Sequence, residues 1–191
     1  GLIDRIAFNT LKFFPATYTG MVVAIMATST ILSPIVPNSY SKCAVLGPFA
    51  ASVAKANNIE KGSKAAAGLF CAFFVPAAIH TMAFLTGSAM TFVLIGMMGE
   101  GYSFSWFGWF ICCSVWFAVN LVLTFLFILV YYRPKEKLNI SKDLINRKIA
   151  ELKPMNSDEK AASVILILSI LLWITGSYTG LKPYTVDRKS T

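Results

Sequence analysis

The residues best suited to bind a small charged solute form one short run inside an apolar stretch. The stretch covers residues 20–54, and the run within it is Ser33-Pro34-Ile35-Val36-Pro37-Asn38-Ser39-Tyr40-Ser41-Lys42. Two prolines three residues apart remove amide donors and clash with the preceding helical turn, so one continuous helix cannot form there. Broken backbone at membrane depth persists only where protein buries it or a wet cavity bathes it, as in the ion and substrate sites of transporters.

The peptide groups freed at such a break can bind ions of both signs. Carbonyl groups at the tip suit a bare sodium ion, and amides at the start of the second helix suit a carboxylate. Asn38, Ser39, Tyr40 and Ser41 add neutral donors that can hold an anion reversibly, and we expect Asn38 and Ser39 to contact it. Lys42 has three alternative roles: attracting the anion, replacing sodium as the fixed cation, or snorkelling to the membrane surface.

The overall composition places this run in a membrane protein. Of 191 residues, 56% are hydrophobic and only 14% are charged, and the mean hydropathy is +0.64. A soluble domain would carry about a quarter charged residues. The net charge of +8 does not indicate a nucleic-acid partner, because the Lys and Arg residues collect in particular loops and form no basic stripe.

The sequence contains no residue pattern typical of a catalytic site. Paired catalytic carboxylates, a nucleophile with its base and a nucleotide-binding glycine pattern are all missing from it. We therefore do not expect an enzyme. We also expect no cofactor and no metal, with sodium as the one candidate coupling ion.

The charges in the loops predict a topology. Residues on both sides of the 20–54 stretch are basic, so the positive-inside rule places both of its ends in the cytoplasm and predicts a re-entrant hairpin. Residues 99–103 carry no Lys or Arg and are expected outside, whereas the strongly basic 133–157 segment is expected in the cytoplasm. The predicted fold is an all-α membrane protein with about three transmembrane helices, one of them broken, and two interfacial helices.

The predicted elements follow one another within a single unit. They are an interfacial helix at 1–15, the re-entrant hairpin at 20–54, a broken transmembrane helix at 65–98, a transmembrane helix at 103–132, a cytoplasmic linker with an amphipathic helix at 133–157 and a transmembrane helix at 158–179. As one helix, residues 65–98 would be about 50 Å long, well beyond a ~30 Å hydrocarbon core. We expect the interruption at Thr86-Gly87-Ser88-Ala89-Met90-Thr91, where small and hydroxyl residues cluster.

Other polar and aromatic residues in the apolar segments are expected to have structural roles. His80 is expected to make an interhelical hydrogen bond, with a proton relay as the alternative, and Asn120 is expected to tie helices together. The Phe and Trp residues of 104–117 are expected to form an interfacial belt and a lipid-facing surface.

Taken together, these segments resemble the divalent anion:sodium symporter family, especially its citrate/succinate and 2-oxoglutarate/malate exchanger branch. The similar segments cover nearly the whole chain in order. They are Gly1-Leu2-Ile3-Asp4-Arg5-Ile6-Ala7, similar to the interfacial helix before the family's cytoplasmic hairpin; Ser33-Pro34-Ile35-Val36-Pro37, similar to the lead-in to the hairpin tip; Phe84-Leu85-Thr86-Gly87, similar to the broken fifth membrane helix; and Leu152-Lys153-Pro154-Met155-Asn156, similar to the linker into the seventh.

This resemblance implies a secondary transporter of small di- or tricarboxylate anions that works by sodium symport or anion exchange. The sodium ligands that it implies are Pro37, Asn38, Thr86, Gly87, Ser88 and Thr91. The tip departs from the family's Ser-Asn-Thr-Ala-Arg order, because Asn38-Ser39-Tyr40-Ser41-Lys42 stands there. The alternatives are a transporter of an inorganic anion such as sulfate, and a non-transporting sensor or scaffold of the same fold.

The same resemblance implies that the chain is incomplete. Transporters of this kind have two inverted halves and form the substrate site between them. The chain begins at Gly1 without an initiator Met, so we expect an N-terminal-half fragment that does not transport on its own. The full-length protein is expected to be a homodimer in the lipid bilayer, in a bacterial inner or plasma membrane, with an elevator-like mechanism.

Overall fold

The fold is helical throughout the part of the chain that the structure describes. A computed structural model describes residues 5–7, 9–10, 13–15, 17–36, 38–98, 104–132, 134, 143–151 and 154–179. Within these ranges the chain forms helices and connecting turns, and no β-strand occurs. The all-α fold expected from the sequence is confirmed.

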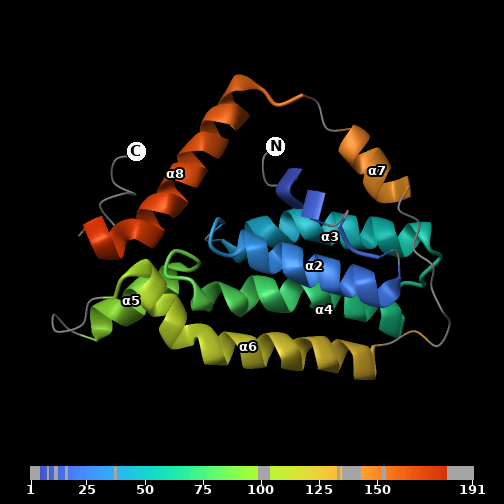
Figure 1. Cartoon of the computed structure of the whole chain (residues 1–191). Helices are drawn as coiled ribbons and strands as arrows, with labels where there is room; N and C mark the ends of the chain where they lie inside the picture. The colour runs from blue at the N-terminus through green and yellow to red at the C-terminus, as the bar shows by residue number, and fades with distance from the viewer. Residues whose placement is uncertain are drawn as a thin grey trace.

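The first two long helices form a helical hairpin. Helix α2 is Tyr18–Leu32 and helix α3 is Ser39–Ala56, and the chain reverses direction between them (Figure 1). Each helix begins at a side-chain cap, since Thr17 accepts a hydrogen bond from the Gly20 amide and Asn38 accepts one from the Tyr40 amide. The break between them falls in the proline-containing run, as the loss of amide donors requires.

The next helical segment is broken, and its break is longer than the sequence indicated. Helix α4 is Lys64–Ala78, a 3₁₀ turn η1 is His80–Ala83, and helix α5 is Ala89–Met97. The interruption was expected at residues 86–91, but the α-helix already ends before η1, and residues 89–91 are helical again. Pro76 lies inside the last turn of α4, where its missing amide and its ring weaken the helix. We call residues 79–88 the unwound segment.

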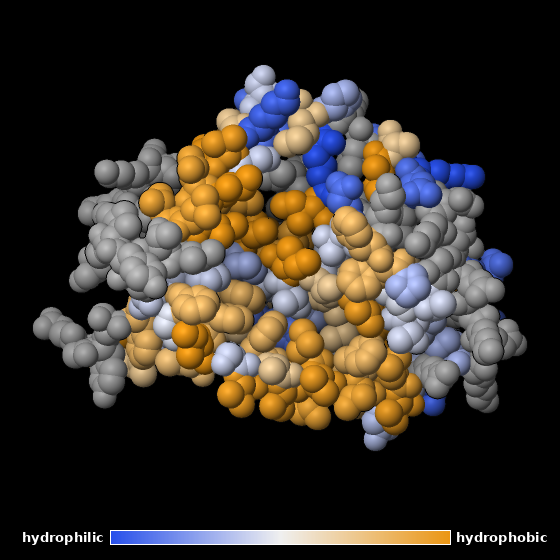
Figure 2. All heavy atoms as spheres, viewed as in Figure 1, coloured by the Kyte–Doolittle hydropathy of each residue, from blue (hydrophilic) through white to orange (hydrophobic). Residues whose placement is uncertain are grey.

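Helix α6, Trp106–Tyr131, runs beside α4 in the opposite direction (Figure 1). Its 26 residues correspond to about 39 Å, enough to cross a ~30 Å hydrocarbon core. Large apolar side chains are exposed along it, and Figure 2 shows the hydrophobic surface on this side of the molecule. By length and composition, Lys64–Ala83 and Trp106–Tyr131 are the two candidate membrane spans among the described residues.

The last two helices complete the chain. Helix α7 is Asp143–Ala150 and helix α8 is Ser157–Thr179. Ile149 of α7 packs against the main core, and α8 contacts α6. The start of α8 is tied to the beginning of the chain by a salt bridge in which Arg5 Nε lies 3.1 Å from Glu159 Oε2.

The main core lies between α2, α3 and α4. Its buried side chains include Met21, Val22, Ile25, Leu46, Phe49, Val53, Leu69 and Phe73. At the end of the hairpin opposite its tip, the buried Tyr18 hydroxyl lies 3.0 Å from the Ala65 carbonyl and 3.1 Å from the Tyr132 carbonyl. This contact joins α2, α4 and the end of α6. The hairpin is therefore anchored at its base and packed along its length, which fixes where the tip lies.

Candidate functional site

The hairpin tip lies directly against the unwound segment. The Thr86 hydroxyl donates a hydrogen bond to the Pro34 carbonyl at 3.1 Å. Gly87 fits so closely that an added Cβ would overlap the Thr81 carbonyl oxygen and lie 3.1 Å from the Ser33 carbonyl oxygen. Two interruptions that are far apart in the sequence thus meet in space and bring several backbone carbonyls together.

The tip also presents the N-terminus of α3. The Asn38 side-chain oxygen accepts from the Tyr40 amide at 2.9 Å, and the first backbone bond of the helix, from the Lys42 amide to the Asn38 carbonyl, is 3.5 Å long. The first amides of a helix have no acceptor within it and carry the positive end of its dipole. The exposed Asn38 keeps its amide nitrogen as a further donor. This helix end is suited to an anion.

The other donors expected at the tip have different surroundings. The Ser39 hydroxyl donates its hydrogen to the Ala77 carbonyl at 2.6 Å, which ties the start of α3 to the end of α4. Ser41 is half-buried, and Tyr40 is 85% exposed. A solute can therefore reach the Asn38 amide and the Tyr40 hydroxyl directly, whereas the Ser39 hydroxyl and the Tyr40 amide already donate hydrogen bonds within the described part of the chain.

Lys42 is completely buried, with 0% of its side chain exposed. Its ammonium donates to the Ser33 hydroxyl at 3.3 Å, and that hydroxyl in turn donates to the Ser29 carbonyl at 2.9 Å. The alternative that Lys42 snorkels to the surface is therefore wrong. In the part of the chain that the structure describes, Lys42 has no carboxylate partner, and a buried charge without a counter-charge is strongly destabilising.

His80 adds a second buried polar group near the tip. Its Nδ1 lies 3.1 Å from the Thr30 hydroxyl, which joins η1 to α2 and confirms the expected interhelical hydrogen bond. The ring packs edge-on against Phe117 with centroids 5.2 Å apart. Its Nε2 is buried and has no hydrogen-bond partner among the described residues.

The expected sodium ligands are divided between the tip and α5. Thr86 and Gly87 contact the tip, whereas the Ser88 hydroxyl caps α5 by accepting from the Met90 amide at 3.2 Å. Thr91 lies in the first turn of α5 with its hydroxyl buried and without a hydrogen-bond partner in the described part of the chain. Pro37, also expected in this set, lies outside the described residues.

Two tryptophans of α6 lie at the candidate site, although the Phe and Trp residues of 104–117 were expected in an interfacial belt and on a lipid-facing surface. Trp106 and Trp109 are each 9% exposed. The Trp106 indole donates to the Thr86 hydroxyl at 3.1 Å, and the Trp109 indole donates to the Met82 carbonyl at 3.0 Å. A buried indole N–H needs a hydrogen-bond acceptor, and the unwound segment contains carbonyl and hydroxyl groups that can accept. The sequence therefore indicates that a buried tryptophan needs an acceptor, but it does not show that Thr86 and Met82 provide it.

The expectation for Asn120 is also wrong. Its side-chain amide donates to the Trp116 carbonyl at 2.9 Å, one turn earlier in α6, and so stays within its own helix. Asparagine can satisfy its donor on the i−4 carbonyl of a helix, and a single sequence does not show whether a neighbouring helix lies within reach.

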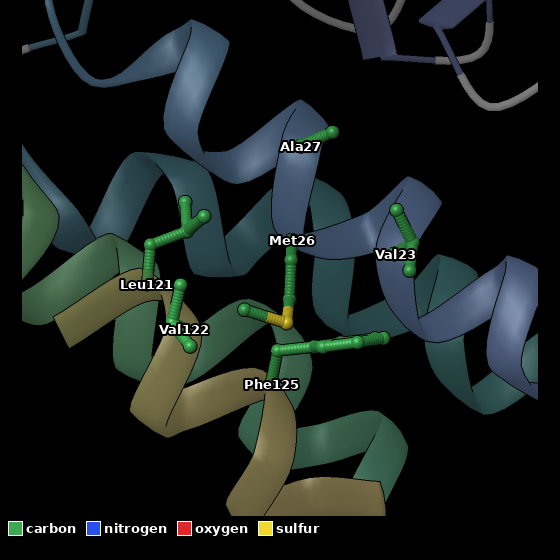
Figure 3. Close-up of a pocket in the computed structure, with 6 residues that line it drawn as sticks. All are labelled: Val23, Met26, Ala27, Leu121, Val122 and Phe125. Carbon is green, nitrogen blue, oxygen red and sulfur yellow. The ribbon is translucent and has the colours of Figure 1, made fainter. Parts of the chain in front are cut away.

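A separate cavity of about 230 Å³ lies between α2 and α6 (Figure 3). It is lined by Val23, Met26, Ala27, Leu121, Val122 and Phe125, and the labelled side chains come from both helices. An entirely apolar lining offers no hydrogen bond to a carboxylate. The tip, with its amides and its buried ammonium, is the better candidate for an anion.

The fold and the candidate site are consistent with one class of membrane protein. Apolar helices of membrane-spanning length, a broken helical hairpin and an unwound segment that meets its tip are typical of membrane transporters. Residues 1–188 match the family described as the sodium:sulfate symporter transmembrane region, which covers nearly the whole chain. The chain belongs to this family of divalent anion:sodium symporters.

Similar proteins occur in bacteria and in chloroplasts. The chain is 26% identical over 178 residues to a membrane protein of Cupriavidus necator, covering 92% of the chain and 35% of the relative. It is 26% identical over 198 residues to the chloroplastic dicarboxylate transporter 1 of Spinacia oleracea, covering 97% and 34%. It is 29% identical over 184 residues to an uncharacterized transporter of Haemophilus influenzae, covering 91% and 38%. The chain thus spans about a third of the length of these relatives.

Proposed function

We propose that this chain forms one half of the substrate site in a secondary transporter of small di- and tricarboxylate anions. The contact between the hairpin tip and the unwound segment carries this proposal, through the Thr86 to Pro34 hydrogen bond and the close approach of Gly87 to Ser33. Helix ends that meet inside a membrane protein offer amides to anions and carbonyls to cations. The dicarboxylate transporters among the relatives support a carboxylate substrate.

In this proposal the anion binds at the N-terminus of α3. The helix amides and the Asn38 side chain donate to one carboxylate, and Ser39, Tyr40 and Ser41 line the approach. Lys42 lies one turn further into the helix and supplies a full positive charge from behind the donors. The remaining contacts to the substrate come from the other half of the transporter.

We favour anion exchange over sodium symport as the mode of coupling. The buried Lys42 ammonium already supplies a positive charge where a symporter would bind sodium, and an anion neutralises that charge. An empty site with an unpaired buried charge opposes reorientation, which favours obligatory exchange. Sodium symport is the second candidate, because the Ser33 and Thr81 carbonyls converge at Gly87 and suit sodium, with Asn38, Thr86, Ser88 and Thr91 as further ligands.

The proposed arrangement in the membrane follows from the basic residues around the hairpin base. Lys55, Lys61 and Lys64 lie at this end and are exposed, which favours a re-entrant hairpin with its base in the cytoplasm. We propose that the full-length protein repeats this half in inverted orientation and forms a homodimer in a bacterial inner or plasma membrane.

Uptake by the full-length protein in lipid vesicles tests the proposal. Labelled succinate, citrate and sulfate are offered with and without a sodium gradient, and to vesicles preloaded with the same unlabelled anion. We expect succinate or citrate uptake that depends on preloading and not on sodium. Sodium-driven uptake would favour symport, sulfate uptake alone would favour an inorganic anion, and no uptake of any anion would favour a sensor or scaffold.

Asn38→Asp tests the anion site directly. Aspartate caps a helix as well as asparagine, so α3 keeps its start, but the variant loses an amide donor and adds a negative charge beside the anion. We expect a more than about tenfold loss of uptake at normal protein yield. Asn38→Ser, which keeps a cap and a neutral donor, is expected to retain part of the activity. Uptake by the aspartate variant at the wild-type rate would remove Asn38 from the site.

A further inference from the structure

The unwound segment has to hold a defined shape without the regular hydrogen bonds of a helix. Backbone acceptors freed inside a membrane protein need donors from neighbouring elements. The first turn of α6 supplies one such donor, the Trp109 indole, which reaches the Met82 carbonyl at 3.0 Å. The Trp106 indole, in the same turn, donates to a side chain of the segment, the Thr86 hydroxyl, at 3.1 Å. The two contacts hold the unwound segment at two points, one in η1 and one in the turn between η1 and α5.

The contact made by Trp106 continues into the hairpin. The Thr86 hydroxyl accepts from the indole and donates its own hydrogen to the Pro34 carbonyl at 3.1 Å. Both hydrogen bonds run in the same direction, from the Trp106 indole to the Thr86 hydroxyl and from that hydroxyl to the Pro34 carbonyl. Hydrogen bonds arranged in this way polarise and strengthen one another in a low-dielectric interior. A side chain of α6 thereby acts on a carbonyl of the tip through the Thr86 hydroxyl.

Packing around Phe84 holds the same relay in place. The Phe84 ring stacks on Phe110 with centroids 5.4 Å apart and lies 6.1 Å from the Trp106 ring. Phe84 and Trp106 belong to a buried cluster with Ala83, Leu85 and Trp109, and the partly buried Phe110 packs against it. Aromatic contacts therefore fix the position of the Trp106 ring, and its N–H contributes only the hydrogen bond to Thr86.

We propose that Trp106 is a positioning residue for the anion site, acting through Thr86 on the Pro34 carbonyl at the hairpin tip. This inference rests on the proposed function for its effect on transport. Without the indole N–H, the Thr86 hydroxyl can turn away from Pro34, and the tip and the unwound segment lose their fixed spacing. Substrate binding then weakens, while the aromatic packing that holds the fold is kept.

A double-mutant cycle with Trp106→Phe and Thr86→Val in the full-length protein tests the relay. Trp106→Phe is expected to raise the KM for labelled succinate about fivefold at unchanged maximal rate and yield, since one hydrogen bond is lost. Thr86→Val removes both bonds of the relay, so adding Trp106→Phe to it should cause no further rise. Trp116→Phe, on the exposed side of the same helix, is the matched control and should leave the KM unchanged.

Hydrogen exchange measured by mass spectrometry gives a readout that does not need transport. Trp106→Phe should speed amide exchange about fivefold in the unwound segment and also around residues 34–42, which the relay reaches through Thr86. Faster exchange in the unwound segment alone, or fold-changes in KM that multiply in the double mutant, would overturn the relay. If the wild type takes up no anion, the proposed function fails, and hydrogen exchange still decides whether the relay exists.

Discussion

Lys42→Met is expected to abolish anion uptake without destabilising the folded protein. Methionine has a similar volume, so it fills the space of the buried lysine between Ser33 and the core. Replacing a buried charge by an apolar residue of similar size is often neutral or stabilising by about 1–4 kcal/mol. The carboxylate of the substrate would lose its counter-charge, and we expect uptake to fall about a hundredfold. Uptake in vesicles and the thermal unfolding temperature together measure both effects.

Two control variants separate the charge of Lys42 from other effects. Lys42→Arg keeps the charge in a larger side chain and should retain measurable uptake, whereas Lys55→Met removes an exposed charge at the end of α3 and should leave uptake within about twofold of the wild type. Normal uptake by Lys42→Met would show that Lys42 is only part of the core. Sodium-dependent uptake that appears in this variant would mean that sodium can take the place of the ammonium.

The interruptions of the helices could be predicted because they depend on local chemistry. Two prolines three residues apart, Pro34 and Pro37, remove amide donors on successive turns, so the break after α2 follows from the sequence. The single prolines Pro48 and Pro76 are accommodated inside α3 and α4. The break after α4 was expected near Gly87, but it starts earlier, at Ile79, because Pro76 already weakens the last turn of α4. Small residues tolerate an irregular backbone, but they do not decide where the regular helix ends.

Contacts between distant segments could not be predicted in the same way. Apolar and aromatic residues on a membrane helix have the same composition whether they face lipid or protein, so Trp106 and Phe107 look alike in the sequence. In the structure Trp106 is buried against the unwound segment, while Phe107 is half exposed. The side toward which Lys42 points likewise depends on how α3 rotates against α2 and α4, which a single sequence does not fix.

Gly87→Ala is expected to remove transport by deforming the unwound segment at the place where it meets the tip. An added Cβ would overlap the Thr81 carbonyl oxygen and lie 3.1 Å from the Ser33 carbonyl oxygen, and both atoms belong to the backbone. Backbone cannot turn aside as a flexible side chain can, so the unwound segment must change shape around Gly87, at a cost of about 1–3 kcal/mol. We expect a loss of uptake of at least about tenfold, because a small misplacement of binding groups has a large effect.

Gly96→Ala is the matched control, because this glycine lies in α5 and an added Cβ would meet no other described part of the chain within 4 Å, apart from its own helix backbone and neighbours. Alanine favours the helix there by up to about 1 kcal/mol, so uptake and yield should be kept. Wild-type uptake by Gly87→Ala would mean that the close contact between tip and unwound segment is not part of the site. Loss of uptake in both variants would instead point to a general sensitivity of this region to added volume. Loss in Gly87→Ala alone ties transport to the place where the two broken elements touch.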